Sequence, residues 1–404
     1  MTRLPNRLQS AWPLVKRLHR FASLLNGFVA RRTSRFRGKR ALPRRATQSS
    51  LGTAALEPDA VTVHQPGETE HIRRELADGV PAGHWIFEDA RSFDVPPRFS
   101  LEITNGIVVG DYGANVTPGG TLDYETSEYF GITGWREHPI FLRRRLPPVE
   151  HVDGTLVSLA TRGGSINYYH YLLDVLPRFG VFEETMPGRR ADALYVPQGA
   201  QYQRDLLAMV GLGDYPVVET LKHRAVEADR LIVPCLPNPQ EVAPRGTVEW
   251  LRSRLPALDT ADKPKRIYVT RGAARNTRRV VQEDALMPLL EDRGFVRIEP
   301  GGMSVREQID HFAAAEVIVA PHGAALTNLV FARPGVRVLE LFPAGFVKAC
   351  FWAITESIPD ARYAYLVSDD GAEHRPGVPM NKIQADIDLD PAEIIEALDR
   401  LLAT

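Results

Sequence analysis

Apolar residues between positions 304 and 342 switch between helical and strand-like spacing, and this pattern predicts half of a doubly wound α/β domain. Ser304 and Glu307 form a Ser-x-x-Glu capping box, which predicts the start of a helix. The apolar run 316–320 fits a strand buried on both faces, small residues then lead into a second helix, and the run 336–342 fits the next strand. Such folds bind ligands at the carboxyl ends of their strands, where free N–H groups of a helix attract phosphate.

The same alternation of strands and helices extends over most of the chain and predicts a parallel sheet. Strands are expected at 156–160, 193–196, 217–219, 230–233, 266–270, 295–298 and 362–366. Helices are expected at 167–184 with a kink at Pro177, at 202–210, 247–255, 283–293 and 347–358, and after an N-cap at Asp390.

The region 84–109 has a shorter, β-rich pattern. Strands are expected at 84–88, 100–103 and 107–109, and Asn105-Gly106 between two apolar runs is a hairpin signal. We therefore expect an N-terminal β-meander. The proline-dense segment 234–244 is predicted to connect two domains.

The N-terminal part of the chain is strongly basic. Residues 1–45 carry 13 Lys or Arg and no Asp or Glu, whereas the rest carries 36 basic and 50 acidic side chains. Apolar residues recur there at helical spacing: Leu8, Trp12, Val15, Leu18, Phe21 and Leu25. A basic amphipathic helix of this kind binds anionic membrane surfaces, although a transit peptide or a disordered tail has a similar composition. Nucleic acid is not expected as a partner, because no aromatic stacking platform accompanies the charge.

Length and composition indicate a multidomain protein. At 404 residues, with 44% hydrophobic and 25% charged residues, the chain is expected to form two or three domains. We place a basic, partly disordered segment with an amphipathic helix at 1–60, including a linker over 31–60, a domain with a β-rich start followed by α/β structure at 61–240 and a second α/β domain at 241–404. No apolar run has the length of a membrane span, and two cysteines suit a reducing compartment. A cytoplasmic location is expected, either free or peripheral on the inner face of the membrane.

Four polar or glycine-containing segments fall at predicted strand ends: 163–174, 271–279, 301–307 and 322–328. The arginines of 271–279 and the two helix N-termini favour an anionic, phosphorylated ligand, although a solvated arginine loop is the simpler alternative. The chain contains neither G-x-G-x-x-G nor G-x-x-x-x-G-K-[ST], so a standard NAD site and a P-loop are not supported. His170 and Asp174 share one helix face, either as a proton acceptor or as a local pair.

Several of these segments together resemble glycosyltransferase family 61. The resemblance rests on NYYHYLLD at 167–174, RIYVTR at 266–271, RRVVQE at 278–283, GF at 294–295, SVREQ at 304–308, PHGAALTNLVF at 321–331 and ELF at 340–342. It covers roughly residues 155–345 with the motifs in order. Three positions depart from the family pattern: Ala325 replaces a usual glycine, Tyr171 a usual tryptophan and Gln282 a usual asparagine.

The resemblance implies a GT-B-like fold, with two Rossmann-like domains facing across a cleft and a β-rich N-terminal extension. Residues 61–240 would form the acceptor-side domain and residues 241–404 the nucleotide-sugar-binding domain. It also implies an inverting glycosyltransferase that uses a nucleotide-sugar as co-substrate and needs no metal or other cofactor. The acceptor would be a glycan or lipid-linked glycan in capsular or other cell-surface polysaccharide biosynthesis. His170 and Asp174 would be catalytic, with Asn167 on the acceptor side. The donor-site positions would be Arg271, Asn276, Arg279, Ser304, Glu307, His322, Gly323, Ala324, Ala325, Thr327, Asn328 and Glu340.

Two other classes of function, a binding scaffold and a hydrolase, are alternatives to a glycosyltransferase. A non-catalytic nucleotide-sugar- or glycan-binding scaffold of the same pathway is compatible with Ala325, although His170, Asp174 and Arg271 argue for catalysis. A hydrolase with a His/Asp pair is disfavoured, because neither a G-x-S-x-G elbow nor an H-E-x-x-H motif occurs. The D-x-D strings at 386–388 and 388–390 are interpreted as helix-capping residues and not as metal ligands.

Overall fold

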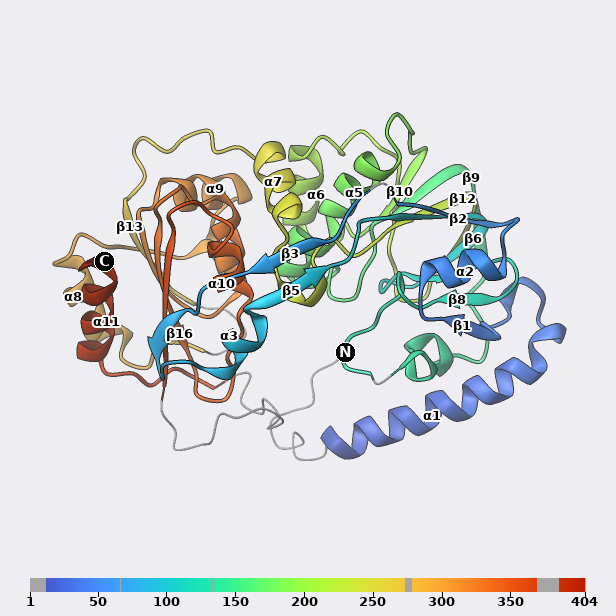
Figure 1. Ribbon diagram of the computed structural model, residues 1–404, viewed down its shortest axis with the longest axis horizontal. Coiled ribbons are helices and arrows are strands. Elements are labelled where there is room, and N and C mark those ends of the chain that lie inside the picture. Colours follow the sequence, from blue (N-terminus) through green and yellow to red (C-terminus); the bar gives the residue numbers. More distant parts are fainter. Residues whose placement is uncertain (1–11, 66, 133, 273–277, 369–384, 404) are drawn as a thin grey trace.

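The computed structural model describes residues 12–65, 67–132, 134–272, 278–368 and 385–403, and these form a mixed α/β fold. Their strands build a nine-stranded sheet, a six-stranded sheet and a two-stranded ribbon. Figure 1 shows the nine-stranded sheet on the right and the six-stranded sheet on the left, with helices between them.

The nine-stranded sheet has a parallel part and an antiparallel part. Its order is β1-β8-β7-β6-β12-β9-β10-β11, and β2 also pairs with β6. The segment β12-β9-β10-β11 is parallel, whereas β2, β7 and β12 each run antiparallel to β6. The strands are β1 (Arg45–Thr47), β2 (Val61–His64), β6 (Ser100–Val109), β7 (Ala114–Val116), β8 (Thr121–Asp123), β9 (Val149–Ser158), β10 (Ala193–Val196), β11 (Val217–Glu219) and β12 (Ala225–Pro234).

The six-stranded sheet is wholly parallel, in the order β14-β13-β15-β16-β17-β4. Its strands are β4 (Asp78–Val80), β13 (Arg266–Val269), β14 (Val296–Ile298), β15 (Val317–Pro321), β16 (Arg337–Phe342) and β17 (Arg362–Val367). The chain passes from β13 to β14 on one side and returns to β15 on the other side of β13. The carboxyl ends of β13 and β15 therefore flank the topological switch point, which is where doubly wound sheets bind ligands.

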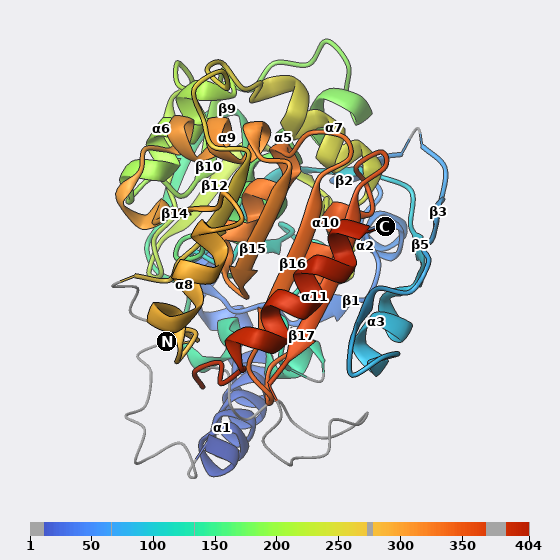
Figure 2. The same ribbon diagram turned by 90° about the vertical axis from the view of Figure 1, so that its left-hand side faces the viewer.

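Helices cover both faces of the six-stranded sheet (Figure 2). On one face, α8 and α11 pack over alternate side chains of β13, β15, β16 and β17. On the other face, α9 and α10 share a continuous hydrophobic cluster with α5, α6 and α7, which also reaches β9, β10 and β12. The helices are α2 (Ser50–Leu56), α3 (Trp85–Ala90), α4 (Tyr168–His170), α5 (Pro177–Thr185), α6 (Gln201–Met209), α7 (Arg245–Arg254), α8 (Glu283–Glu291), α9 (Val305–Ala314), α10 (Cys350–Thr355) and α11 (Pro391–Ala403).

The basic N-terminal helix is present as α1 (Trp12–Thr33), while Leu8 of the predicted pattern lies outside the described residues. No helix in the described ranges is both long and apolar enough to cross a bilayer. The prediction of a linker at 31–60 is wrong. This segment forms β1, at one edge of the nine-stranded sheet, and the helix α2, which is capped by Ser49.

Two β predictions near the N-terminus are also wrong. Residues 84–88 do not form a strand, because His84 caps the short helix α3. Asn105-Gly106 does not form a hairpin turn, because β6 continues through it and pairs with β12 on one side and β2 on the other. Asn105 does adopt the left-handed conformation that the dipeptide favours, with φ 52°. An antiparallel meander does form, but from β6, β7 and β8 over residues 100–123, and the strands predicted at 100–103 and 107–109 are both parts of β6.

The ribbon of β3 (Glu70–Arg73) and β5 (Ser92–Val95) leads from the nine-stranded sheet toward the six-stranded one (Figure 1). Between these two strands, β4 pairs with β17 and α3 packs Phe87 against Tyr365, with ring centroids 4.4 Å apart. A segment N-terminal to residue 95 thus contributes to the six-stranded sheet.

Candidate active site

Two loops meet at the switch point of the six-stranded sheet. Arg271 follows β13, and His322 and Gly323 follow β15. A Cβ atom built on Gly323 would lie 2.1 Å from Nη1 of Arg271, so the guanidinium group rests directly on this glycine. The φ of Gly323 is −179°, which any residue adopts. Glycine is therefore required here for the close approach of Arg271 and not for the backbone conformation.

The segment after Gly323 is a 3₁₀ helix, η9 (Ala324–Phe331), where an α-helix was expected. Thr327 Oγ1 donates to the carbonyl of Ala324 at 2.7 Å, and Asn328 Nδ2 donates to that of Ala325 at 3.0 Å. In an α-helix these carbonyl groups would accept hydrogen bonds from backbone amides four residues later. Here the side chains of Thr327 and Asn328 occupy them, so they compete with α-helical hydrogen bonding. The first amides of η9 have no acceptor within the helix, and η9 begins next to Gly323, on which Arg271 rests. This end of the helix therefore suits an anion.

His322, Glu340 and Tyr363 form a buried chain of hydrogen bonds under this turn. His322 Nδ1 and Glu340 Oε1 are 2.5 Å apart, and the hydroxyl of Tyr363 donates to Glu340 Oε2. Burial lowers the pKa of His322 well below its usual value, and the charges of Arg278, Lys348 and Arg271 act in the same direction. Burial also raises the pKa of Glu340 well above its usual value. The pair therefore favours the form in which both side chains are neutral.

Cationic side chains surround this neutral pair. The guanidinium carbon of Arg278 lies 5.2 Å from the centre of the Phe346 ring, and Lys348 Nζ donates to Glu241 Oε2 at 2.8 Å. The amides of Arg278 and Arg279 donate to Asp386 Oδ1 at 2.9 and 3.0 Å, which fixes this part of the arginine loop. The capping interpretation is therefore wrong for Asp386, which anchors the loop. It agrees with Asp390, which accepts from the amide of Ala392 at the start of α11.

His170 and Asp174 form the second half of the candidate site. His170 Nδ1 donates to Asp174 Oδ2 at 2.6 Å. Asp174 lies in a π-helical turn, Tyr171–Val175, that joins α4 to α5. Pro177 follows this turn and has no N–H to donate back to the helix, so the regular α-helical pattern is interrupted as predicted. Gly163 lies against the ring, because its Cβ would be 2.6 Å from His170 Cδ2.

The surroundings of His170 make it a better base than an isolated histidine. Burial alone would lower the pKa of His170, but the hydrogen bond and charge of Asp174, together with the charge of Glu241, outweigh it and raise this pKa. Burial raises the pKa of Asp174 as well. Both shifts favour uptake of a proton by the pair.

Phe351 connects the two halves. Its ring centre lies 5.8 Å from that of Tyr169 and 5.1 Å from that of His322. The charge of Lys348 lowers the pKa of both His170 and His322, so it acts on both groups. The Tyr168 hydroxyl also donates to Asn328 Oδ1 at 2.8 Å, which ties α4 to η9. His170 and His322 thus belong to one continuous cluster.

Several predicted site residues have structural partners of their own. Asn167 caps α4 by accepting from the amide of Tyr169 at 2.9 Å. Ser304 and Glu307 form the predicted reciprocal capping box of α9. Thr327 and Asn328 are fully buried. Arg279 is exposed, and its Nε donates to the carbonyl of Gly272 at 3.0 Å. Asn276 lies outside the described residues.

The sequence interpretation missed the contribution of the proline-dense segment 234–244. Asn238 Nδ2 donates to Asp174 Oδ1 and to the Tyr169 hydroxyl, both at 3.1 Å, and Glu241 pairs with Lys348. Gln240, Glu241 and Ala243 all have positive φ, between 46° and 61°. Left-handed non-glycine residues are strained and cluster at functional sites, but this signal is invisible before the backbone is known.

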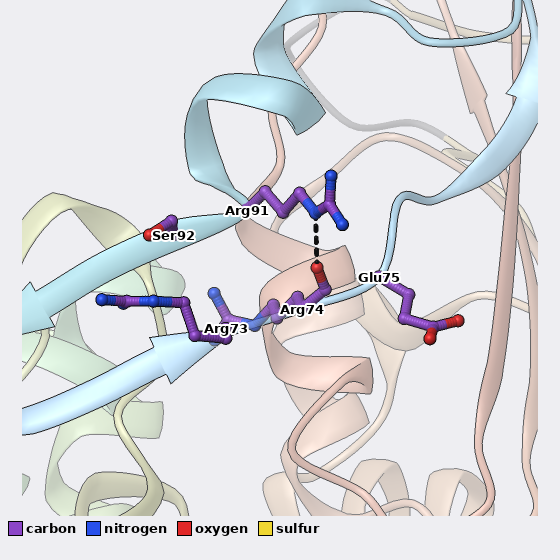
Figure 3. A pocket seen from close by; sticks show the side chains of 5 residues that line it. All are labelled: Arg73, Arg74, Glu75, Arg91 and Ser92. Carbon is purple, nitrogen blue, oxygen red and sulfur yellow. Dashed lines mark hydrogen bonds between the residues drawn. The ribbon is translucent and has the colours of Figure 1, made fainter.

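A separate cavity of about 470 Å³ is lined by Arg73, Arg74, Glu75, Arg91 and Ser92 (Figure 3). In Figure 3 the side chains of Arg73, Arg91 and Glu75 point in different directions, and Arg91 Nε donates to the carbonyl of Arg74 at 2.9 Å. The cavity contains none of the predicted site residues. Because its charged groups diverge, it is a poor match for a pyrophosphate.

Within the described residues, a group able to ligate a metal ion is formed by His151, Asp153 and Asp229. All three are exposed, and none of them was predicted as a site residue.

The family model described as Glycosyltransferase 61 matches residues 168–339. This range contains the His170–Asp174 pair, the end of β13 with Arg271, and the turn at His322 and Gly323. A search of curated proteins gave no match.

Proposed function

Because residues 168–339 belong to glycosyltransferase family 61, we propose that this glycosyltransferase moves a sugar from a nucleotide-sugar donor to a hydroxyl group of a glycan acceptor, with inversion at the anomeric carbon. The observation that carries the proposal is the ring of Phe351, which contacts Tyr169 and His322. Tyr169 precedes His170, whose pKa is raised, and His322 precedes Gly323, on which Arg271 rests.

The donor pyrophosphate would bind at the carboxyl ends of β13 and β15. Arg271, Arg278 and the first amides of η9 supply positive charge and N–H donors there, and these groups stabilise the negative charge that develops on the leaving diphosphate. This side-chain set can do so without a metal ion. In the GT-B-like arrangement that we propose, the six-stranded sheet carries the donor and the nine-stranded sheet faces the acceptor.

His170 would act as the general base. Its Nδ1–H group is bonded to Asp174, so neutral Nε2 carries the free lone pair. The His170 side chain is 17% exposed to solvent. Nε2 would take the proton of the acceptor hydroxyl while that oxygen bonds to the anomeric carbon. The bond from this carbon to the diphosphate oxygen breaks at the same time, and the nucleoside diphosphate leaves with the electron pair.

Phe130 would contact the acceptor. Its exposed ring lies 5.7 Å from the His170 ring, nearly parallel to it, and the Arg162 guanidinium carbon is 3.7 Å from the Phe130 ring centre. An exposed aromatic side chain beside the base can pack against a sugar ring. We propose a glycan or lipid-linked glycan of cell-surface polysaccharide biosynthesis as the acceptor.

Incubation with a panel of UDP-, GDP- and dTDP-linked sugars tests the proposal. One donor should be hydrolysed slowly without an acceptor, and the released sugar should first appear with the inverted anomeric configuration by NMR. Nucleotide-sugar binding without turnover for any acceptor would instead indicate the non-catalytic scaffold. Absence of both binding and turnover would contradict the proposal.

A further inference from the structure

The N-terminal helix α1 is attached to the rest of the protein by its small and polar residues. Ser23 and Ala30 are fully buried, and Asn26 Nδ2 donates to the carbonyl of Phe141 at 2.5 Å. A Cβ atom on Gly27 would lie 3.3 Å from the Phe141 ring, so the helix backbone comes close to the body of the protein. These contacts fix which side of α1 faces outward.

The outward side of α1 is apolar. Its residues follow the helical spacing i, i+4, i+7, i+11 and i+14, and each is between 49% and 66% exposed. This outer stripe consists of Leu14, Leu18, Phe21, Leu25 and Phe28. A surface helix normally turns such a stripe toward the core, because burying it is favourable. Here α1 lies along the edge of the molecule with the stripe exposed (Figure 1).

The charge of α1 indicates what covers the stripe. The helix carries Lys16, Arg17, Arg20, Arg31 and Arg32 and has no acidic residue. Residues 1–45 as a whole carry 13 basic and no acidic side chains. Two copies of α1 packed through their stripes would bring these like charges together, which opposes self-association. A surface of anionic lipids would cover the apolar stripe and attract the net positive charge of this segment.

We propose that α1 binds in the plane of an anionic lipid bilayer, with the outer stripe inserted at the boundary of headgroups and acyl chains and the positive charge of residues 1–45 attracted by the lipid phosphate groups. This goes beyond the proposed transferase activity and is independent of it. It requires no membrane-spanning segment.

Sedimentation of the full chain with vesicles tests the proposal. The wild type should sediment with phosphatidylglycerol/phosphatidylcholine vesicles, and much less with pure phosphatidylcholine vesicles or at high salt. Leu18→Ser/Leu25→Ser should lower the partition coefficient by about tenfold or more, because two exposed leucines no longer insert. Lys16→Glu/Arg17→Glu should lower it by a similar factor, about tenfold.

The matched control is Leu51→Ser/Leu258→Ser, which changes two leucines outside α1 that are at least as exposed and should leave vesicle binding unchanged. Equal binding of the stripe variant and the control would overturn the proposal. Failure of the wild type to bind anionic vesicles would also overturn it. A wild-type dimer that is abolished by Leu18→Ser/Leu25→Ser would overturn it too, because the partner of the stripe would then be a second copy of the chain. Donor hydrolysis in solution, measured in parallel, keeps this result separate from the transferase activity.

Discussion

The guanidinium group of Arg271 rests on the α-carbon of Gly323, at the place where any other residue would carry its Cβ atom. This contact joins the loops after β13 and β15 at the switch point of the six-stranded sheet. It brings a cation and the first amides of η9 to one place.

Gly323→Ala should therefore displace Arg271 and weaken binding of nucleoside diphosphates by about tenfold or more, since a charge-assisted contact is lost. Stability should change little, because the backbone at Gly323 is extended. Isothermal titration of the variant measures the affinity. Gly134→Ala is the matched control, since a Cβ there meets no atom within 4 Å. Equal affinities of both variants would show that the contact does not position Arg271 for the ligand.

His170→Ala should reduce turnover by about 10²–10⁴-fold, the usual contribution of a general base. The base must be unprotonated, and its pKa is raised, so kcat/KM of the wild type should fall on the acidic side with a midpoint above about 6.5. Asp174→Asn removes the carboxylate that contributes most to raising this pKa, so the midpoint should move to lower pH.

Lys348→Met should move the same midpoint in the opposite direction, because the charge of Lys348 lowers the pKa of His170. The pH–rate profiles of the two variants form a matched pair. Shifts in the same direction would contradict the assignment of the base.

The buried His322–Glu340–Tyr363 chain makes a prediction about stability. Because burial favours the neutral form of Glu340, Glu340→Gln should keep both hydrogen bonds and cost less than about 1 kcal/mol. Glu340→Ala should cost about 3 kcal/mol, because His322 and Tyr363 then lose their shared buried partner. Urea denaturation measures both values. A large loss for Glu340→Gln would indicate that the carboxylate is ionised.

Phe130→Ala should raise the KM for the acceptor by about tenfold and leave donor hydrolysis nearly unchanged, since an exposed aromatic face contributes about 1 kcal/mol or more. Leu142→Ala, which truncates another exposed apolar residue, serves as the control. A rise in the KM for the donor instead would show that Phe130 contacts the donor and not the acceptor.

Sequence patterns predicted the parallel strands well, because their apolar runs are local signals. The expected bounds of β10 and β11 agree with the observed ones, and the capping box at Ser304 and Glu307 starts α9 as predicted. The hairpin at Asn105-Gly106 was wrong because this part of β6 pairs with β12, more than a hundred residues further along the chain. The sequence of the dipeptide does not indicate pairing with a strand so far away in the chain.

The candidate site was predictable only in part. Motif spacing identified His170, Asp174 and the turn at His322, whose partners lie nearby in sequence or along parallel strands. Asn238, Glu241 and Lys348 could not be recognised, since they reach the site through tertiary folding of irregular segments. The capping roles of Ser304 and Glu307 follow from the sequence alone, whereas any further contact with a donor remains a prediction.

The central claim is that the turn formed by Arg271 and Gly323 binds the diphosphate of the donor. Titration of UDP and GDP into the wild type and into Arg271→Ala, with EDTA present throughout, tests it most directly. We predict that one nucleotide binds the wild type without divalent metal and binds Arg271→Ala at least about tenfold more weakly. Failure of both nucleotides to bind the wild type, or equal binding to the two proteins, would contradict the claim.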